Sequence, residues 1–348
     1  MKSVSEYGGK KEMIKYTNLG NTDVRVSQIA LGCGFRGLFD LNEATSVIDQ
    51  AIDLGINFVD CANIYKLRSG EQAEIALGRA LSGRREKVVI TSKFGSFQQV
   101  NAGEISFGKS REIMFKAVEN SLKRLKTDYI DFYFLHAPAD DVPMEETIEA
   151  FDTLRRQGKI RYYGLSNHNV AEVSDALDIA KKNGLYGLSV LQNPYNLLNR
   201  HLETELEPIV RKEKLGLMTY SPVATGLLGG AFSRGKPIPE KSTWGYNEMY
   251  REYFKSFFPG KVEIIVNLVQ DIADSNNVSS AAVATAWVLR NDAVTACIAG
   301  SDSVDELKDS LAAFDVVIPA DQLAELDKLS EGMEEFLSID KIMEKFGK

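Results

Sequence analysis

Short apolar runs alternate along the chain with segments of helical periodicity. The runs are rich in β-branched residues and lack polar alternation, which is typical of strands covered on both faces. They lie at residues 26–31, 56–60, 88–91, 129–135, 160–165, 188–191, 217–220 and 294–298. Between them, apolar residues form helical stripes, as Ala44, Val47 and Ile48 do in residues 43–54. Further helices are expected at residues 71–81, 111–125, 144–156, 170–182, 203–212, 262–274, 280–290 and 304–313.

Eight strand–helix units in strict alternation predict a parallel sheet with right-handed crossovers. Their number and length fit an α/β fold, a (β/α)8 TIM barrel that includes residues 1–348 as one domain. Residues 13–27 are expected to add an N-terminal β-hairpin that turns at residues 19–22, and residues 320–348 a C-terminal helical tail. Asn42 and Ser303 are expected to begin the first and last helices of the barrel. Residues 223–260 form one long interval, which usually indicates a functional or mobile loop.

Composition and charge exclude several classes of protein. The chain has 41 Lys and Arg against 49 Asp and Glu, a net charge of −8, so we expect no nucleic acid and no membrane surface as a partner. It has no apolar stretch of 18 residues and no apolar signal core near its N-terminus. Cys33, Cys61 and Cys297 show neither metal-site spacing nor an even count. Reduced thiols, a cytoplasmic location and the absence of a metal site are the simplest interpretation.

Two glycine-rich segments match nucleotide-binding motifs. Residues 32–37 match G-x-G-x-x-G after an apolar run, with Asp53 or Asp60 as the later acid, so a doubly wound dinucleotide domain is an alternative. The helix in that motif opens within the glycines, however, whereas here residues 38–42 intervene. Residues 230–236 have the spacing of a P-loop, but Pro237 stands where Ser or Thr would ligate magnesium, and we discard this match.

Four chemistry-bearing residues lie at the ends of three successive predicted strands. Asp60 ends one strand and Tyr65 follows it, Lys93 closes the next strand, and His136 follows the third. Because the carboxyl ends of barrel strands meet at one mouth, we expect these side chains to converge. Each also has an ordinary structural interpretation: a cap or ion pair, a loop aromatic, a lysine that reaches water, and a hydrogen-bonded histidine.

Together these four residues predict the reduction of a carbonyl group. A phenol has an ordinary pKa of about 10 and needs help to act as an acid near neutrality. The Lys93 ammonium is expected to lower the pKa of Tyr65, and Asp60 to hold Lys93 charged. His136 would hydrogen-bond the substrate oxygen, and Tyr65 would donate a proton as hydride reaches the carbon.

The segments around these residues resemble motifs of the aldo-keto reductase superfamily. Residues 56–65 are similar to its second-strand motif, and residues 89–95 and 129–136 to its lysine and histidine segments. Residues 158–167 resemble its fifth-strand signature, and the resemblance extends over about residues 16–329. It implies a (β/α)8 barrel that binds NAD(P)H across its mouth and reversibly reduces aldehydes or ketones.

The resemblance also implies a cofactor site. Ser166, Asn167 and Gln192 would hold the nicotinamide carboxamide, and Tyr220 would stack on the ring. Residues 221–229 would line the pyrophosphate. The complete set implied is Gly32, Cys33, Gly34, Ser166, Asn167, Gln192, Tyr220, Ser221, Pro222, Val223, Thr225, Gly226, Gly300, Ser301, Asp302, Glu306 and Ser310.

Charges in one segment bear on the choice of cofactor. Asp302 and Glu306 stand where many members of the superfamily carry basic residues, and residues 298–307 contain no Lys or Arg. A 2′-phosphate requires cations, whereas a free ribose hydroxyl accepts an acid. The resemblance therefore implies NADP(H), and the two acids make NAD(H) the alternative, unless a lysine from residues 223–260 supplies the missing charge.

Aromatic and basic residues are the candidates for the substrate pocket. Loops at the mouth are expected to place Phe35, Arg36, Phe94 and Trp244 against the substrate, with Phe97 nearby. Such walls suit sugar-like or aromatic carbonyl compounds, although residues 246–258 could equally be a helix packed on the barrel. Lys66 and Arg68 either favour an anionic or polyhydroxylated substrate or belong to a solvated loop.

The predicted function is therefore that of an NAD(P)H-dependent carbonyl reductase acting on a small molecule. The alternative is a cofactor-binding redox-sensing or auxiliary subunit with slow turnover, as some relatives in the superfamily are. The intact set Asp60, Tyr65, Lys93 and His136 favours the enzyme. The natural substrate, the physiological direction and the oligomeric state stay open.

Overall fold

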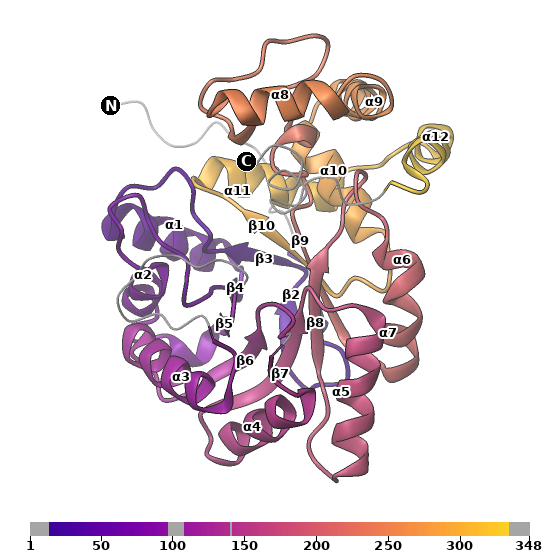
Figure 1. Cartoon of the computed structure of the whole chain (residues 1–348). Coiled ribbons are helices and arrows are strands. Elements are labelled where there is room, and N and C mark those ends of the chain that lie inside the picture. Colours follow the sequence, from indigo (N-terminus) through magenta and orange to yellow (C-terminus); the bar gives the residue numbers. More distant parts are fainter. Residues whose placement is uncertain (1–13, 97–107, 140, 334–348) are drawn as a thin grey trace.

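A closed ring of parallel strands stands at the centre of the computed structural model, which describes residues 14–96, 108–139 and 141–333 (Figure 1). The strands follow one another in chain order, and β10 pairs with β3 to close the ring. They are β3 (Ile29–Gly32), β4 (Phe58–Asp60), β5 (Val89–Phe94), β6 (Ile130–Leu135), β7 (Ile160–Ser166), β8 (Val190–Pro194), β9 (Gly216–Tyr220) and β10 (Ala296–Gly300). The predicted (β/α)8 barrel is confirmed, and the doubly wound alternative is wrong.

Helices surround the ring and bury their apolar stripes against the outer faces of the strands (Figure 1). They are α1 (Leu41–Leu54), α2 (Ala73–Ala80), α3 (Arg111–Leu125), α4 (Met144–Arg156), α5 (Val170–Lys182), α6 (Leu202–Glu205), α7 (Glu207–Glu213), α8 (Glu248–Phe257), α9 (Lys261–Asn276), α10 (Ser280–Leu289), α11 (Val304–Leu311) and α12 (Ala320–Ser330). Short 3-10 turns are η1 (Arg85–Lys87), η2 (Leu227–Gly229), η3 (Thr243–Gly245) and η4 (Ala312–Asp315).

Two helix boundaries differ from the sequence prediction. The side chain of Asp40, not of Asn42, caps α1, because its carboxylate accepts hydrogen bonds from the amides of Asn42 (2.7 Å) and Glu43 (3.0 Å). The helix expected at residues 203–212 is divided at Leu206, since Pro208 lacks the amide hydrogen that a continuous helix needs. Ser303 caps α11, as predicted.

The predicted N-terminal hairpin is confirmed and closes one end of the barrel. Its strands are β1 (Tyr16–Asn18) and β2 (Arg25–Ser27), so the apolar run at 26–31 is shared between the hairpin and β3. Leu19 and Val26 are fully buried in one cluster with Phe132 of the barrel interior. At Gly20, φ is +61° and a Cβ would lie 2.2 Å from the Gly216 nitrogen, so only glycine allows the turn to approach β9 this closely.

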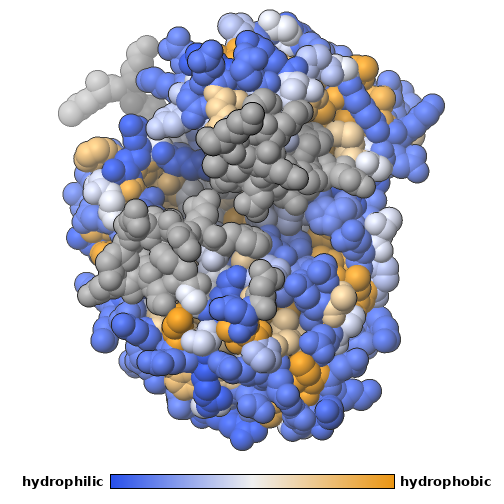
Figure 2. Space-filling model, viewed as in Figure 1, coloured by the Kyte–Doolittle hydropathy of each residue, from blue (hydrophilic) through white to orange (hydrophobic). Residues whose placement is uncertain are grey.

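The long interval at residues 223–260 holds η2, η3 and α8, and Figure 1 shows α8 beside α9 at the upper edge of the molecule. Of the predicted tail, α12 is helical, and residues 334–348 lie outside the described residues. The face seen in Figure 2 is mostly hydrophilic, with small scattered apolar patches. Among the described helices, none has the length and apolarity to cross a membrane.

Candidate active site

The structure brings the four predicted catalytic residues together at the carboxyl ends of three neighbouring strands. Asp60 ends β4, Lys93 lies near the end of β5, and His136 follows β6 directly. Tyr65 comes from the loop after β4, and its ring meets the His136 ring edge-on with centroids 5.9 Å apart. The phenol, ammonium, carboxylate and imidazole thus share one neighbourhood, as the strand ends predicted.

Lys93 is the centre of this group. Its side chain is fully buried, and its Nζ donates to both oxygens of Asp60 (2.8 and 2.7 Å) and to the Cys61 carbonyl (2.9 Å). Nζ also lies 3.4 Å from the Tyr65 hydroxyl oxygen and 4.9 Å from the centre of its ring. All of the ammonium's hydrogen-bonding capacity is directed at the site, so a structural lysine that reaches for water is ruled out.

Two further residues, absent from the predicted catalytic set, hold the Asp60 carboxylate in place. Thr91, two residues before Lys93 on β5, donates its hydroxyl to Asp60 Oδ1 (2.5 Å). Gln192 on β8 donates its amide to the same oxygen (2.8 Å). Because successive strand residues point to opposite faces, the positions 91 and 93 share the inner face of the barrel, a signal that could have identified the threonine.

Burial and charge set the protonation states of the ammonium and the phenol. Burial by itself would lower the pKa of Lys93, but the Asp60 carboxylate outweighs it, and the pKa of Lys93 is raised. Burial raises the pKa of Tyr65; Lys93 opposes this shift, but the Asp60 charge adds to it. Lys93 thus lowers the pKa of Tyr65, as predicted, but burial and the Asp60 charge outweigh it, and the pKa of Tyr65 is raised overall. The phenol keeps its proton at neutral pH.

His136 is held as a neutral imidazole. Burial, and then the charge of Lys93, lower the pKa of His136 well below its ordinary value. Its Nδ1 is buried and has no hydrogen-bond partner among the described residues. An unpaired acceptor costs less than an unpaired donor, so the tautomer protonated on Nε2 is favoured. That nitrogen is then the donor available to a ligand at the mouth.

Residues expected around a nicotinamide lie directly beside this group. Asn167 follows β7 in a left-handed conformation (φ +64°), and its side-chain nitrogen donates to the His136 carbonyl (2.8 Å). Its side-chain oxygen accepts the Tyr220 hydroxyl (2.6 Å). Ser166 pairs in register with Gln192, the residue that contacts Asp60. The predicted amide-binding residues and the catalytic residues therefore form one connected network.

The segment after β9 has an unusual backbone. Ser221, Ala224 and Thr225 have φ of +58°, +48° and +54°, and Gly226 follows with +90°. These residues form consecutive turns, in which the Ala224 amide donates to the Ser221 carbonyl (2.9 Å) and the Gly226 amide to the Val223 carbonyl (3.0 Å). Asn196 supports the segment by donating to the Ser221 carbonyl (2.9 Å). Of this segment, Pro222 is buried, and Val223 and Thr225 are partly exposed.

At the far edge of the mouth, the acidic residues are already engaged. Asp302 accepts hydrogen bonds from the backbone amides of Arg36 (3.0 Å) and Gly37 (2.8 Å), and Glu306 accepts one from the Asp302 amide (2.9 Å). Asp302 therefore ties the loop after β10 to the loop after β3. The hydroxyl of Ser310 donates to the backbone carbonyl of Glu306. Recognition of a ribose hydroxyl by these carboxylates stays a prediction, because a carboxylate that accepts one backbone amide on an oxygen keeps further lone pairs there.

The glycines expected at the mouth lie there, but the neighbouring cysteine faces away. Gly32 ends β3, and a Cβ on Gly34 would lie 3.8 Å from the Tyr65 ring. Gly300 ends β10, and the Ser301 hydroxyl after it is buried with no hydrogen-bond partner among the described residues. Cys33 is fully buried in the core cluster between strands and helices, so its side chain cannot bind a cofactor.

Two of the four predicted substrate residues are placed elsewhere. Phe94 is fully buried, stacks on Tyr133 (5.5 Å) and meets Phe151 of α4 edge-on, so it packs outside the ring and not in the mouth. Trp244 is 1% exposed within the aromatic cluster of the long interval, which favours the packing interpretation of that segment.

The other two substrate candidates lie in the loop after β3. Phe35 is buried at this loop, and the Arg36 guanidinium donates to the Thr243 hydroxyl (3.2 Å). Lys66 is partly exposed and Arg68 is exposed in the loop after Tyr65. Phe97 lies outside the described residues.

A (β/α)8 barrel with an acid–lysine–tyrosine–histidine group at the carboxyl ends of its strands defines a barrel oxidoreductase. Residues 29–331 match the model of the Aldo/keto reductase family. The chain belongs to that family, as the motifs predicted.

Curated relatives cover nearly the whole chain. It is 35% identical over 327 residues to "Uncharacterized oxidoreductase YrpG" of Bacillus subtilis (strain 168). This alignment covers 92% of this chain and 97% of the relative. It is 32% identical to each of two proteins named "Probable voltage-gated potassium channel subunit beta". The one from Oryza sativa subsp. japonica aligns over 87% of this chain and 92% of its own length, and the one from Arabidopsis thaliana over 91% and 96%.

Proposed function

We propose that the chain catalyses the NAD(P)H-dependent, reversible reduction of an aldehyde or ketone to an alcohol. The observation that carries this proposal is the bridge made by the Lys93 ammonium between the Asp60 carboxylate and the Tyr65 hydroxyl. A reduced nicotinamide, when bound, supplies the hydride. The residues of the chain supply the proton, the orientation of the carbonyl and the charge that stabilises its oxygen.

Tyr65 is the proton donor in this proposal. Its raised pKa keeps the phenol protonated at neutral pH, and the Lys93 ammonium at 3.4 Å stabilises the phenolate that proton transfer leaves behind. His136, neutral and protonated on Nε2, donates a hydrogen bond to the substrate oxygen and fixes the direction of the carbonyl. Two donors thus converge on one oxygen, where negative charge develops during reduction.

The residues at the mouth fit a nicotinamide dinucleotide. Ser166 and Gln192 place a hydroxyl and an amide oxygen beside the proposed catalytic residues for the carboxamide. The Asn167 side chain is bonded to the His136 carbonyl and the Tyr220 hydroxyl, so it would exchange one of these hydrogen bonds for the cofactor. In the turns at residues 221–226, the amides of Ala224 and Gly226 are used internally, and those of Val223 and Thr225 would be the donors to the pyrophosphate. The Ser301 hydroxyl, buried without a partner among the described residues, offers a hydrogen bond at the other side of the mouth.

We propose that NAD(H) is accepted as well as NADP(H). Asp302 and Glu306 accept backbone amides and keep further lone pairs for a ribose hydroxyl, and both are negative charges that disfavour a 2′-phosphate. Comparing KM for NADH and NADPH tests this. Values within about tenfold of each other are expected; a KM for NADPH lower by several orders of magnitude would contradict the proposal.

A carbonyl panel tests the activity itself. Purified protein is mixed with NADPH or NADH and with aliphatic, aromatic and sugar aldehydes or ketones, and the loss of nicotinamide absorbance is followed. Turnover that disappears in Tyr65→Phe supports the proposal. Tight cofactor binding without turnover on any member of the panel would overturn it.

A second function is favoured by one specific observation: two relatives at 32% identity are named as potassium channel β subunits. The chain would then act as a cofactor-binding auxiliary protein with slow turnover. This alternative predicts stoichiometric hydride transfer in a single turnover but a steady-state rate limited by release of the oxidised cofactor. Rapid multiple turnover would reject it.

A further inference from the structure

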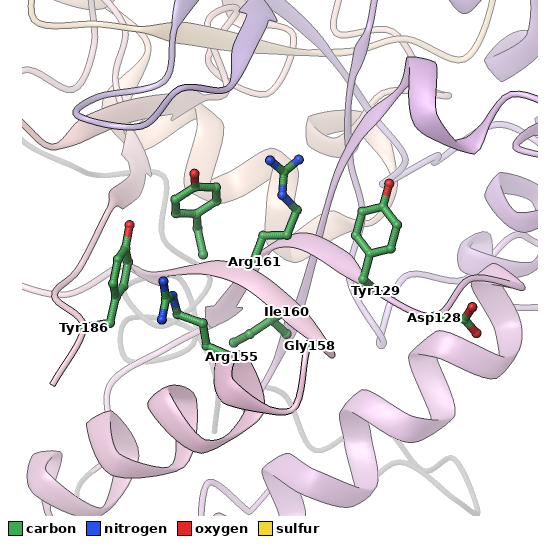
Figure 3. Close-up of a pocket in the computed structure, with 8 residues that line it drawn as sticks. Asp128, Tyr129, Arg155, Gly158, Ile160, Arg161 and Tyr186 are labelled. Atoms are coloured by element: carbon green, nitrogen blue, oxygen red, sulfur yellow. The ribbon is translucent and has the colours of Figure 1, made fainter.

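A hollow of about 550 Å³ opens at the amino-terminal end of the barrel, away from the catalytic residues (Figure 3). Its walls come from the residues just before β6, the end of α4, the start of β7 and the loop after α5. The lining residues are Asp128, Tyr129, Arg155, Gly158, Ile160, Arg161, Tyr162 and Tyr186. Since the catalytic group lies at the carboxyl ends of the strands, this is a separate site.

Arg155 contributes a cation that lacks a counter-ion. In the last turn of α4, its guanidinium lies over the Tyr186 ring, 3.8 Å from the centroid. Its Nε is buried without a hydrogen-bond partner, and no ion pair involves Arg155 among the described residues. A partly desolvated guanidinium with unused donors binds a carboxylate or phosphate strongly, because it can form charge-assisted hydrogen bonds in a fixed fork.

Arg161 provides a second cation on the same wall. Its guanidinium bonds to Asp131 (3.1 Å), a buried carboxylate that is shared with Arg85 (2.8 Å). Asp23 adds a second negative charge near Arg161, and it accepts the Tyr162 hydroxyl (2.6 Å). Two carboxylates thus already serve Arg85 and Arg161. The third nearby carboxylate, Asp152, pairs with Arg156 (2.7 Å), so Arg155 has no ion-pair partner among the described residues.

Asp128, the acidic residue among those that line the hollow, lies away from the two arginines. In Figure 3 the Asp128 carboxylate lies beyond Tyr129, on the far side from the guanidinium groups of Arg155 and Arg161. The half of the hollow that contains the two arginines is therefore the positive half.

Tyrosine rings give the hollow flat walls. Tyr129, Tyr162 and Tyr186 all line it, and the Tyr162 and Tyr186 centroids lie 6.1 Å apart. A Cβ on Gly158 would meet nothing within 4 Å, so the space beside this residue is open. Aromatic walls favour a planar ring, which stacks or meets them edge-on.

We propose that this hollow binds a small aromatic carboxylate, with its carboxylate on Arg155 and its ring against the tyrosines. The site is independent of the carbonyl chemistry at the mouth. It combines one guanidinium without an ion-pair partner among the described residues, a second cation, Arg161, on the same wall, and an aromatic surface within a volume that suits a single-ring ligand.

Calorimetric titration of the full-length protein, saturated with NADP⁺, with benzoate tests the proposal. Arg155→Met retains the apolar stem and removes the charge, and Arg161→Gln retains polarity. Arg79→Met is the matched control, because Arg79 is an exposed arginine in the last turn of another helix, α2, and does not line the hollow. Thermal melting of each variant verifies that it is folded.

Benzoate is expected to bind the wild type and Arg79→Met equally and to bind Arg155→Met at least about tenfold more weakly. Arg161→Gln is expected to weaken binding by a smaller factor. Benzamide, which lacks the charge, and inorganic phosphate, which lacks the ring, are both expected to bind less tightly than benzoate. Equal affinity in wild type and Arg155→Met, or phosphate binding as tight as benzoate binding, would overturn the proposal.

Discussion

The two ends of the barrel interior bury different kinds of side chain. At the carboxyl ends of the strands, Lys93 and Asp60 are buried as a hydrogen-bonded ion pair. At the amino ends, Leu19 and Val26 of the hairpin join Phe132 in an apolar plug. Loss of one partner at the mouth leaves an uncompensated buried charge, whereas truncation in the plug leaves only a cavity. Chemistry and closure are thus carried by different residues of the same ring.

The largest effect is expected from Lys93→Met. It leaves Asp60 buried without its cation and removes the charge beside Tyr65, so we expect a loss of about 3–5 kcal/mol in the free energy of unfolding. Turnover is expected to fall roughly 100- to 1,000-fold. Urea unfolding and carbonyl reduction assays measure the two. Lys87→Met, at an exposed position in the turn η1 just before β5, is the control. An equal effect of this substitution would contradict the account.

In the plug, Phe132→Ala is expected to reduce the free energy of unfolding by about 3–5 kcal/mol, because it opens a cavity under the hairpin. Turnover below the melting temperature is expected to change by less than about twofold, since the catalytic group is at the other end of the ring. Tyr246→Ala, which removes an aromatic side chain that is 79% exposed, serves as the control. A large loss of turnover with unchanged stability would show that the two ends are not separate.

A smaller effect is expected from Thr91→Val. The substitution keeps the shape and removes the hydroxyl that donates to Asp60, at a cost of about 1–2 kcal/mol in unfolding free energy. Turnover is expected to fall several-fold, as the carboxylate that orients Lys93 is held less firmly. Thr285→Val is the comparison, because that buried hydroxyl has no partner among the described residues, and it is expected to be neutral or stabilising. A larger loss of unfolding free energy in Thr285→Val than in Thr91→Val would refute this role for Thr91.

The smallest effect on kcat/KM is expected from a change of pH within the neutral range. The pKa of His136 is lowered by burial and by Lys93, and the pKa of Tyr65 is raised, so neither group changes its protonation between roughly pH 6 and 8. kcat/KM for reduction is expected to be constant over that interval and to decline at higher pH as the phenol ionises. A fall in kcat/KM below an apparent pKa near 6.5 that is absent from His136→Gln would show that the histidine titrates in the working range.

Local patterns predicted the barrel well. Continuous apolar runs identified all eight strands, because each strand is covered on both faces and therefore lacks alternation. The boundaries of helices and strands were harder to predict in two places. At residues 26–31 two strands share one apolar run, and at Leu206 a proline divides a helix. There the tertiary contacts of the hairpin and the missing amide of Pro208 decide the outcome, and neither is visible in hydrophobic periodicity.

Strand ends predicted the catalytic group, but not which side of the ring every neighbour faces. Phe94 was expected in the mouth, yet it follows Lys93 directly and so points to the opposite side, toward α4. The sequence did not indicate that Asp302 also binds two backbone amides of a loop about 265 positions away in the chain. Such long-range pairings depend on how loops fold over the mouth, which spacing along the chain cannot show.

The most direct measurement is the rate of hydride transfer in a single turnover by Tyr65→Phe, beside the affinity of this variant for NADPH. The account predicts unchanged cofactor binding, since the ring remains in place, and a rate of transfer lower by roughly 100- to 10,000-fold, since the acid is gone. A rate within about twofold of wild type would contradict the assignment of Tyr65 as the proton donor.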